Sequence, residues 1–488
     1  MTLAPEPAIP GLRERFTVPV LAFGGILMAL MQTVAVPLLP DLPRLTGASA
    51  GAVAWMVTAT LLAGAVFTPV LGRAGDMYGK RRVLLLALGL MTAGSMVCAM
   101  TSDIRLLIAA RALQGAAAAV VPLSISILRD ELPPARTGSA VALMSSTVGI
   151  GAALGLPLAA LIVEFANWHV MFWVTTALGA LGLAAAWWAV RESPVRTQGR
   201  FDFAGAAGLS AGLICLLLAI SQGSDWGWTS PTVLGLLAAT VIVLTAWWGH
   251  QLRTRDPLVD LRLARKPRVA LPHLAALLTG FAFYANSLIT AQLLQAPKAT
   301  GYGLALSVFE TGLCMLPTGL IMLILSPVSA RISAARGPKI ALAAGAAVIA
   351  AGYAVRIADS KDLWLIVLGA AVVASGTALA YSALPTLILQ AVPASQTASA
   401  NGVNVLMRTV GQATCSAAVT AVLIHNTAAI GTLRIATLHG YLLAFGMAGT
   451  VALLACALAL VIPGQRGAAG IPKQQRAEAV AEAALEEA

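Results

Sequence analysis

Charged and aromatic residues are scarce in this chain. Only 10% of its 488 residues are Asp, Glu, Lys or Arg, and only 6% are Phe, Trp or Tyr. Hydrophobic residues make up 59%, and the mean hydropathy is +0.85. A soluble globular domain needs roughly 25% charged residues to cover its surface. The composition therefore excludes a typical soluble protein.

The chain also lacks the residue clusters that carry most enzyme chemistry. It has no phosphate-binding Gly-x-x-x-x-Gly-Lys-Ser/Thr loop and no Cys/His group with metal-ligand spacing. Its five cysteines all fall within apolar runs without a pairing pattern, so we expect buried, inert thiols. We therefore expect neither an enzyme nor a nucleotide-driven pump, with no metal and no other cofactor.

Long apolar runs dominate what is present. A membrane-spanning helix needs about 20 apolar residues, and the sequence contains fourteen such runs. They cover residues 17–39, 52–71, 83–101, 105–128, 138–163, 169–190, 204–221, 231–249, 269–293, 303–326, 340–357, 363–390, 399–424 and 438–462. The sequence predicts an all-α, multi-pass membrane protein with fourteen transmembrane helices.

The positive charge indicates the orientation of these helices. The net charge is +11, and 23 of the 31 Lys and Arg fall in segments on one side if the amino terminus is cytoplasmic. Short cytoplasmic loops collect Lys and Arg. We therefore expect both termini in the cytoplasm, a location in the cell (cytoplasmic) membrane, and no nucleic-acid partner.

Two sequence repeats indicate a duplication. Residues 327–339 resemble residues 72–82 at an offset of 258, with alanine in place of the aspartate of the first copy. The tripeptide Thr-Val-Gly at 147–149 recurs at 409–411, at an offset of 262. Two signals at nearly equal offsets predict two related halves.

Six spans in each half would require a shorter offset than the one observed. The excess predicts two additional helices, near 204–221 and 231–249, between two six-helix bundles. The expected organisation is a tail at 1–16, a bundle at 17–190, a linker with two extra helices at 191–268, a second bundle at 269–462, and a tail at 463–488.

The segment from Gly72 to Arg82 reads Gly-Arg-Ala-Gly-Asp-Met-Tyr-Gly-Lys-Arg-Arg, between two apolar runs. Its four cations and three glycines predict a tight, water-exposed turn. The Asp76 carboxylate there can accept hydrogen bonds from the amino terminus of a neighbouring helix, and Arg129 is a candidate ionic partner. The alternative is a solvated turn without such a contact.

The pattern Gly-x-x-x-Asp-x-x-Gly-Lys-Arg-Arg resembles the signature loop of the major facilitator superfamily of transporters. An ordinary positively charged loop is the alternative. The resemblance implies that this loop holds the two halves together on the cytoplasmic side in the outward-open state. The gating residues that it indicates are Gly72, Asp76, Gly79, Lys80, Arg81, Arg82 and Arg129.

Arg111 lies in the fourth apolar run, in the stretch Arg-Ala-Leu-Gln114-Gly115. A guanidinium is costly in a bilayer and is expected to face a cavity or a partner. The stretch resembles the Arg-x-x-Gln-Gly motif of the same superfamily, and this resemblance implies a role in proton coupling. A snorkelling or structurally paired arginine is the alternative.

The fifth apolar run carries Gly151, Gly155 and Pro157 in a stretch that resembles the superfamily's antiporter motif, Gly-Pro-x-x-Gly-Gly. The match is incomplete, because Leu156 precedes the proline and alanines replace the last two glycines. The resemblance suggests antiport. Small residues that only allow close helix packing are the alternative.

Further stretches, among them Asn404-Val-Leu-Met-Arg408-Thr-Val-Gly, look like the fourteen-span drug:proton antiporter branch. That branch usually has an aspartate in the first span where this chain has Met31. No carboxylate lies near the middle of a run, so the candidate proton sites are Glu310, about two turns into the tenth run, and Glu164. Either could instead be an interfacial acid.

Together these features predict a proton-coupled exporter of hydrophobic or amphipathic small molecules, such as drugs or antibiotics, working by alternating access. An uncoupled facilitator, an importer of a small solute and a transporter-like receptor are the alternatives. We expect the lipid bilayer, protons and a small-molecule substrate as partners, and a functional monomer. The expected polar cavity residues are Gln32, Gln114, Asn404 and Arg408.

Overall fold

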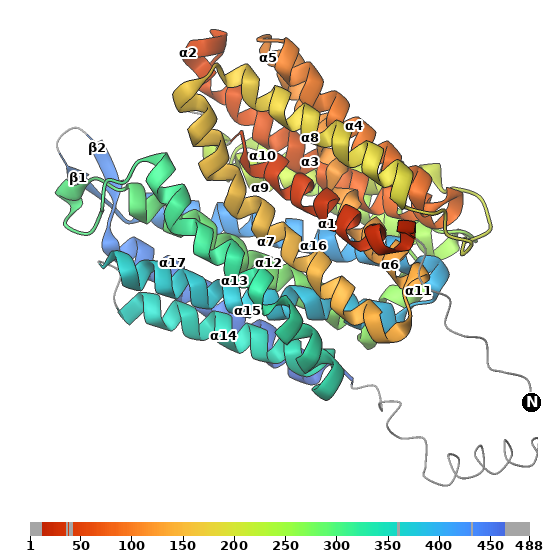
Figure 1. Cartoon of the computed structure of the whole chain (residues 1–488). Coiled ribbons are helices and arrows are strands. Elements are labelled where there is room, and N and C mark those ends of the chain that lie inside the picture. Colours follow the sequence, from red (N-terminus) through yellow and green to blue (C-terminus); the bar gives the residue numbers. More distant parts are fainter. Residues whose placement is uncertain (1–11, 36–37, 39–41, 359–361, 431–432, 464–488) are drawn as a thin grey trace, which may run out of the picture.

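The structure is a computed structural model, and it describes all residues except 1–11, 36–37, 39–41, 359–361, 431–432 and 464–488. The described part is almost entirely helical (Figure 1). Its N-terminal half contains α1 (Leu12–Thr33), α2 (Leu42–Thr46), α3 (Ala50–Tyr78), α4 (Lys80–Met100), α5 (Ile104–Gln114), the 3₁₀ helix η2 (Gly115–Ala119), α6 (Val120–Glu131), α7 (Pro134–Phe165) and α8 (Trp168–Ala189).

Two helices and a short turn of helix follow before the C-terminal half. They are α9 (Phe203–Trp226), α10 (Pro231–Arg253) and α11 (Leu261–Ala264). The C-terminal half contains α12 (Pro267–Gln295), η3 (Lys298–Thr300), α13 (Val308–Arg336), α14 (Pro338–Ala358), α15 (Leu363–Ala391), η4 (Ala394–Gln396), α16 (Thr397–His425), the antiparallel strands β1 (Thr427–Ile430) and β2 (Leu433–Ala436), and α17 (Leu438–Val461).

Thirteen helical segments of the described chain are long and apolar enough to span a membrane, counting α5, η2 and α6 as one. The other long helix, α16, has 29 residues but carries buried polar side chains, among them Asn401, Asn404 and Arg408. Because of these polar side chains, α16 is less apolar than the thirteen other segments. The predicted all-α membrane fold is confirmed, and α16 occupies the place of the thirteenth predicted span.

Several predicted boundaries are wrong. The first helix ends at Thr33 and not at residue 39, the fourth span is interrupted by η2, and the tenth begins at Val308 and not at residue 303. The hairpin of β1 and β2 was not expected. The predicted turn over 72–82 is reduced to one residue, Gly79, because α3 and α4 take up the remainder.

Most helices in the described chain begin at a side chain that caps them. Ser49, Asp103, Asn167, Ser230 and Thr437 each accept a hydrogen bond from a backbone N–H group of the first turn. The first four N–H groups of a helix have no partner within the helix, and short polar side chains at this position bind one of them. These polar caps define where the apolar segments begin.

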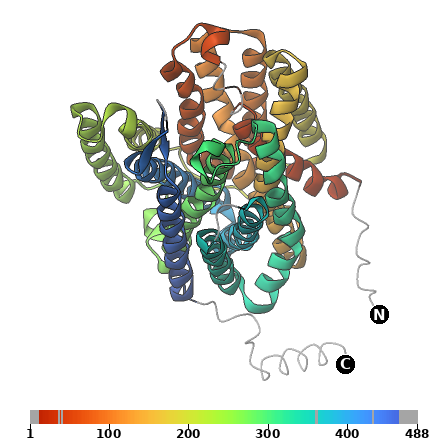
Figure 2. The same ribbon diagram turned by 90° about the vertical axis from the view of Figure 1, so that its left-hand side faces the viewer.

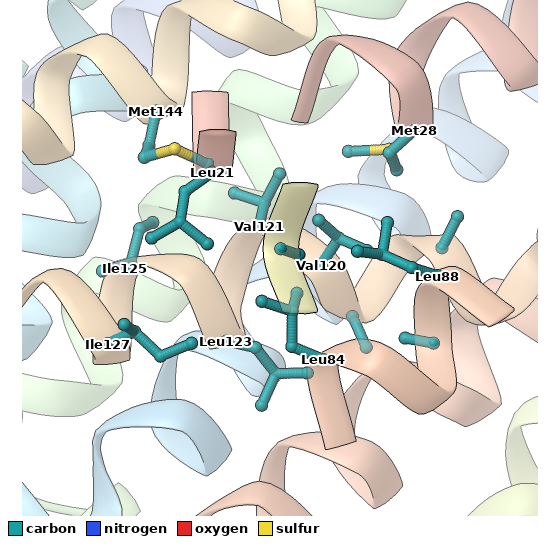
Figure 3. Close-up of a cluster of buried hydrophobic side chains, with 14 of the residues drawn as sticks. Leu21, Met28, Leu84, Leu88, Val120, Val121, Leu123, Ile125, Ile127 and Met144 are labelled. Carbon is teal, nitrogen blue, oxygen red and sulfur yellow. The ribbon is translucent and has the colours of Figure 1, made fainter. Parts of the chain in front are cut away.

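Two large apolar clusters lie within the two halves. Figure 3 shows the N-terminal cluster, in which side chains of α1, α4, α6 and α7 gather, with Leu84, Val120 and Leu123 almost fully buried. The C-terminal cluster includes Phe445 and Tyr353. Between the halves, α3 and α6 pack against α16, and α7 packs against α13. The pair α9–α10 lies at one side of the molecule (Figure 2), where α9 contacts α3 and α16.

Candidate functional site

Gly79 is the only residue between α3 and α4, and its backbone has a φ of +115°. An L-residue with a side chain rarely adopts this conformation, whereas glycine does so freely. A Cβ at this position would also lie 2.7 Å from Oε1 of Glu192. The glycine therefore allows two long helices to meet without a loop.

Gly79→Ala is expected to destabilise the protein by about 1–3 kcal/mol, the usual cost of a backbone held in a sparsely populated conformation. Gly89→Ala is the matched control, because Gly89 lies inside α4 with open space where a Cβ would be placed. The control should be neutral or slightly stabilising. Thermal unfolding of the purified variants measures both effects, and equal melting temperatures would contradict the prediction.

Asp76 lies in the last turn of α3, and its side chain is fully buried. Its Oδ1 accepts a hydrogen bond from the N–H group of Ala398 at 3.1 Å, and its Oδ2 accepts one from Ser399 at 2.8 Å. Both N–H groups belong to the first turn of α16, where the partial positive charge of a helix favours an anion. The expected hydrogen bonds to a helix amino terminus are present, and they join the two halves.

Gly72 explains how α3 approaches α16 so closely. A Cβ on Gly72 would lie 2.7 Å from the carbonyl oxygen of Ala398. The glycine is thus required one turn before Asp76, where the two backbones pass each other. In the predicted gating segment, Gly72 allows α3 to come close to α16, and Asp76 accepts the hydrogen bonds from the first turn of α16.

Arg129 does not form the expected ion pair with Asp76 in the described structure. Its guanidinium donates hydrogen bonds to the carbonyl oxygen of Val392 at 3.2 Å and to the hydroxyl of Thr397 at 2.6 Å. Val392 follows the last residue of α15, where the partial negative charge of that helix favours a cation. Asp76 and Arg129 therefore bind the C-terminal half independently, one at a helix start and one at a helix end.

The other cations of the predicted gating segment are not all exposed to water, as was expected for a turn. Lys80 is fully buried and forms an ion pair with Asp130 at the end of α6, and Ser193 donates a hydrogen bond of 2.6 Å to the same carboxylate. Arg81 is partly buried, and its N–H donates to Glu192. Only Arg82 is largely exposed, with 74% of its side chain accessible.

The segment between α8 and α9 adds a contact that the sequence did not indicate. The N–H group of Thr197 donates to the carbonyl oxygen of Asp76 at 2.7 Å, and its hydroxyl donates to the carbonyl oxygen of Ser395 at 2.5 Å. One residue thus bridges the end of α3 and the connection that precedes α16. We call Asp76, Arg129 and Thr197, with the residues 392–399 that they bind, the inter-half contact.

Asp202 fixes the near ends of α9 and α10. Its carboxylate accepts hydrogen bonds from the N–H group of Gly205 at 2.7 Å, from His250 at 2.9 Å and from Gln251 at 2.8 Å. Partial burial raises the pKa of Asp202, but these hydrogen bonds outweigh it and hold the pKa below its usual range. The Asp202 carboxylate thus joins the beginning of α9 to the end of α10. This junction lies at the same end of the molecule as the inter-half contact.

Arg111 lies near the end of α5 and is almost fully buried. Its Nη1 donates to the carbonyl oxygen of Met31 at 3.0 Å and to Oε1 of Gln114 at 2.6 Å. Met31 belongs to the last turn of α1, where carbonyl groups lack a partner within the helix and the partial charge is negative. The carboxyl end of α1 thus accommodates a buried cation that has no acidic partner in the described structure.

Gln114 extends this network to α4. Its Nε2 donates to the hydroxyl of Ser95 at 2.8 Å, and that hydroxyl contacts the sulfur atom of Met31 at 3.4 Å. Met31 occupies the position at which the resembled branch has an aspartate, and it lies directly beside Arg111. Gln114 was expected to line a substrate cavity, but it is 98% buried within this network.

The glycines and the proline of the predicted antiporter motif pack α7 against two different neighbours. A Cβ on Gly151 or Gly155 would clash with α1, at Ile26 and at Thr33 respectively. Pro157 instead faces α13, where a Cβ on Gly312 would lie 3.1 Å from the proline. The motif therefore supports close packing within the N-terminal half and also between the halves.

The other expected cavity residues lie in different environments. Arg408 is buried, with its guanidinium 4.6 Å from the centre of the Tyr381 ring, a distance typical of a cation–π contact. Asn404 is almost fully buried one turn earlier on α16. Gln32 is exposed, and its side-chain amide contacts the sulfur atom of Met28 at 3.5 Å.

Comparison with known proteins identifies the family of this arrangement. Residues 21–415 match the Major Facilitator Superfamily. The chain belongs to the Major Facilitator Superfamily. It is therefore a membrane transporter and not an enzyme.

Relatives within the superfamily are named for drug resistance. The multidrug resistance protein Stp of Mycobacterium tuberculosis is 29% identical over 393 residues, which cover 79% of this chain and 72% of that protein. The tetracenomycin C resistance and export protein of Streptomyces glaucescens is 27% identical over 370 residues, or 74% of this chain and 68% of that protein. Both are similar to this chain over most of its spans.

A solved structure supports the fold. The human organic anion transporter MFSD10 (TETRAN) superposes with a TM-score of 0.66 over 91% of this chain and 99% of that one. Its sequence identity is 18%, so the likeness concerns the superfamily fold alone.

The two predicted proton sites of this superfamily member are at helix ends. Glu310 lies in the first turn of α13, where it forms a capping box: Ser307 N–H donates to Oε2 of Glu310 at 2.8 Å, and Glu310 N–H donates to the hydroxyl of Ser307 at 3.2 Å. The expectation that Glu310 lies two turns into the tenth span is wrong, because α13 begins at Val308. Glu164 lies at the end of α7, and its side chain is outside the described set.

One buried charge of the superfamily member was not among the predicted site residues. Arg356 lies in α14 and is 99% buried. Its Nη1 donates to Oδ1 of Asn286 on α12 at 2.7 Å, and its guanidinium lies 4.1 Å from the centre of the Phe445 ring. The position of Arg356 inside the predicted run 340–357 was a signal that could have identified it.

Proposed function

We propose that the protein is a secondary exporter in the cytoplasmic membrane that moves hydrophobic or amphipathic small molecules, drugs and antibiotics among them, outward in exchange for protons. The drug-resistance names of its relatives support this assignment. The proposed orientation places both termini in the cytoplasm, because 23 of the 31 Lys and Arg then face that side. The inter-half contact lies on the cytoplasmic side in this orientation.

The inter-half contact is the observation that carries this proposal. Alternating access requires the two halves to separate at one end and to meet again. The contact is made by polar groups at helix ends, at Asp76 and Arg129, and in the connection between α8 and α9, at Thr197. Water can replace such hydrogen bonds when the halves part, so the contact is suited to repeated opening. Its presence corresponds to a state closed on the cytoplasmic side.

The buried charges favour neutral or anionic amphiphiles as substrates. Four arginines of the described chain, Arg73, Arg111, Arg356 and Arg408, are buried within the long helices. In the described chain, every acidic residue of a long helix lies within a few residues of that helix's end. A compact cation would need a fixed negative partner in this environment, so an interior with this charge pattern favours other substrates.

An uncoupled facilitator is the second candidate, and one observation favours it. The two candidate proton sites, Glu310 and Glu164, lie at helix ends, and Met31 stands where the resembled branch has an aspartate. The described spans therefore offer no carboxylate at mid-membrane depth. Transport driven by the substrate gradient alone would need none.

Everted vesicles that contain the protein are expected to accumulate a neutral fluorescent amphiphile while a pH gradient, acid inside, is maintained. Dissipating the gradient should release the amphiphile, because proton exit would no longer drive its uptake. Vesicles without the protein provide the control. Accumulation that is unaffected by loss of the gradient would contradict antiport and support the facilitator.

The same assay tests Glu310. Glu310→Gln is expected to leave coupling unchanged, because glutamine also closes a capping box. Loss of gradient-driven accumulation in this variant, with normal amounts of protein in the membrane, would instead assign proton binding to Glu310.

A further inference from the structure

A cavity of about 810 Å³ lies at the boundary between the two halves. Its walls come from the beginning of α1, the end of α6 and the beginning of α7, and across from them the part of α13 just past its middle. Glu131, the last residue of α6 and the neighbour of Asp130, lies in its wall. The cavity is therefore at the same end of the bundle as the inter-half contact, but at a separate place.

Cations surround this cavity. Arg15 on α1, Arg136 on α7 and Arg191 after α8 all line it, and all three are exposed. Among the described residues of the lining, Glu131 is the single acid, and its Oε1 accepts a hydrogen bond from the N–H group of Arg191 at 3.3 Å. The excess of positive charge favours an anion. Guanidinium groups bind phosphate especially well, because their N–H groups match two of its oxygens.

Apart from the hydroxyl groups of Ser139 and Ser326, the remaining described wall of the cavity is mostly apolar. Val18, Leu143 and Leu323 contribute partly exposed aliphatic side chains, from α1, α7 and α13 respectively. Leu323 is 38% exposed. A free inorganic anion would contact only the polar groups of the lining and leave this apolar surface uncovered. A ligand that matches the whole cavity carries a phosphate at one end and a hydrocarbon chain at the other.

We infer that the cavity binds an anionic phospholipid of the cytoplasmic leaflet, with its phosphate at Arg15 and Arg136 and an acyl chain against α7 and α13. The arginines lie in the first turns of spanning helices, which is the depth of lipid headgroups. Basic pockets between helices on the cytoplasmic side are known to hold anionic headgroups. The inference depends on the orientation in the proposed function, and not on the substrate or on proton coupling.

The site includes residues of both halves, so lipid binding depends on how the halves are arranged. A ligand shifts a conformational equilibrium only by its difference in affinity for the two states. A phospholipid that contacts α1 and α7 on one side and α13 on the other binds best when these helices are at the distance seen here. The anionic lipid therefore stabilises the arrangement in which the inter-half contact is formed.

Native mass spectrometry of the full-length protein, titrated in detergent with phosphatidylglycerol or phosphatidylcholine, tests this site. We expect the wild type to retain phosphatidylglycerol preferentially. Arg15→Gln combined with Arg136→Gln should weaken that retention about 30-fold, the factor that corresponds to the loss of two arginine contacts near a membrane surface. Arg253→Gln is the matched control, because this exposed arginine at the end of α10 lies outside the cavity.

Three results would overturn the inference. The first is equal retention of the two lipids by the wild type, which requires no variant and so does not depend on variant folding. The second is an equal loss of phosphatidylglycerol in the Arg253→Gln control. The third is complete displacement of the lipid by inorganic phosphate at the same concentration, which would indicate a site for free phosphate. Absence of drug transport would refute the proposed function and leave the lipid measurement unaffected.

Discussion

Replacing Asp76 by asparagine is expected to reduce efflux at least tenfold at equal protein levels. The carboxylate accepts two hydrogen bonds, from Ala398 and Ser399, at a fully buried position. An asparagine can accept only one of them, and its amide would place a donor against the other N–H group. Loss of a charge-assisted hydrogen bond at a buried site costs about 2–3 kcal/mol.

This cost acts on one state of the transport cycle. Both hydrogen bonds are formed only while α3 and α16 are together, so Asp76→Asn destabilises the closed state relative to the open one. A change of about 2–3 kcal/mol shifts the ratio of the two states roughly 30- to 150-fold. Distance measurements between spin labels on the ends of α6 and α15 should show the separated arrangement becoming more populated.

Asp103→Asn is the matched control for this result. Asp103 also accepts hydrogen bonds at a helix amino terminus, from Arg105 and Leu106, but it is exposed and its contacts lie within one half. Asparagine is a good helix cap, so efflux should remain within about twofold of wild type. Wild-type efflux by Asp76→Asn, or an equal loss in both variants, would contradict the assigned role of Asp76.

Arg111→Gln is expected to reduce efflux more than tenfold and to lower the melting temperature by about 5 °C. The guanidinium binds the carbonyl oxygen of Met31 at the end of α1 and Oε1 of Gln114. Glutamine is too short to reach both groups, so buried acceptors lose their donor. The connection between α1 and the network that reaches Ser95 on α4 would be broken.

Arg111→Lys should be intermediate, because one ammonium group can reproduce the two bonds of Nη1 but not the contact of Nε with the carbonyl oxygen of Met56. Ser95→Ala removes only the last hydrogen bond of the network and should keep most of the efflux. Transport assays combined with thermal unfolding distinguish these variants. Efflux by Arg111→Gln at wild-type levels would show that the buried charge has no part in transport.

The sequence predicted most of the membrane architecture because the bilayer imposes simple requirements. Spans must be long, apolar and helical, so thirteen of the fourteen predicted runs correspond to helices that meet these requirements. The hydrogen bonds of Asp76 were also predictable, since a carboxylate in a short connection finds few partners better than a helix amino terminus.

The error at Glu310 has a local physical cause. The apolar run 303–326 contains residues before Ser307 that belong to a connection, and apolarity alone cannot separate them from the helix. The sequence Ser307-Val-Phe-Glu310 has the form of a capping box, which marks the start of the helix at Val308. Reading this signal would have placed Glu310 at the membrane surface.

Other features depended on tertiary contacts that one sequence does not contain. Arg129 was expected to pair with Asp76 by charge alone, whereas it binds the carbonyl oxygen of Val392, 263 residues away along the chain. The partner of Arg356, Asn286, lies on a different helix. Neither partner is marked by a motif, because a backbone carbonyl and a single asparagine leave no pattern in the sequence.

The segment between α8 and α9 also limits how far the pair α9–α10 can move away from the N-terminal half. Ser193 holds its beginning to Asp130 at the end of α6, and Asp202, nine residues later, holds its end to α10. Nine extended residues reach up to about 30 Å, which is the largest distance that this segment permits between its two anchors. Within that limit, the position of Thr197 between α3 and the connection before α16 is set by its hydrogen bonds to Asp76 and Ser395.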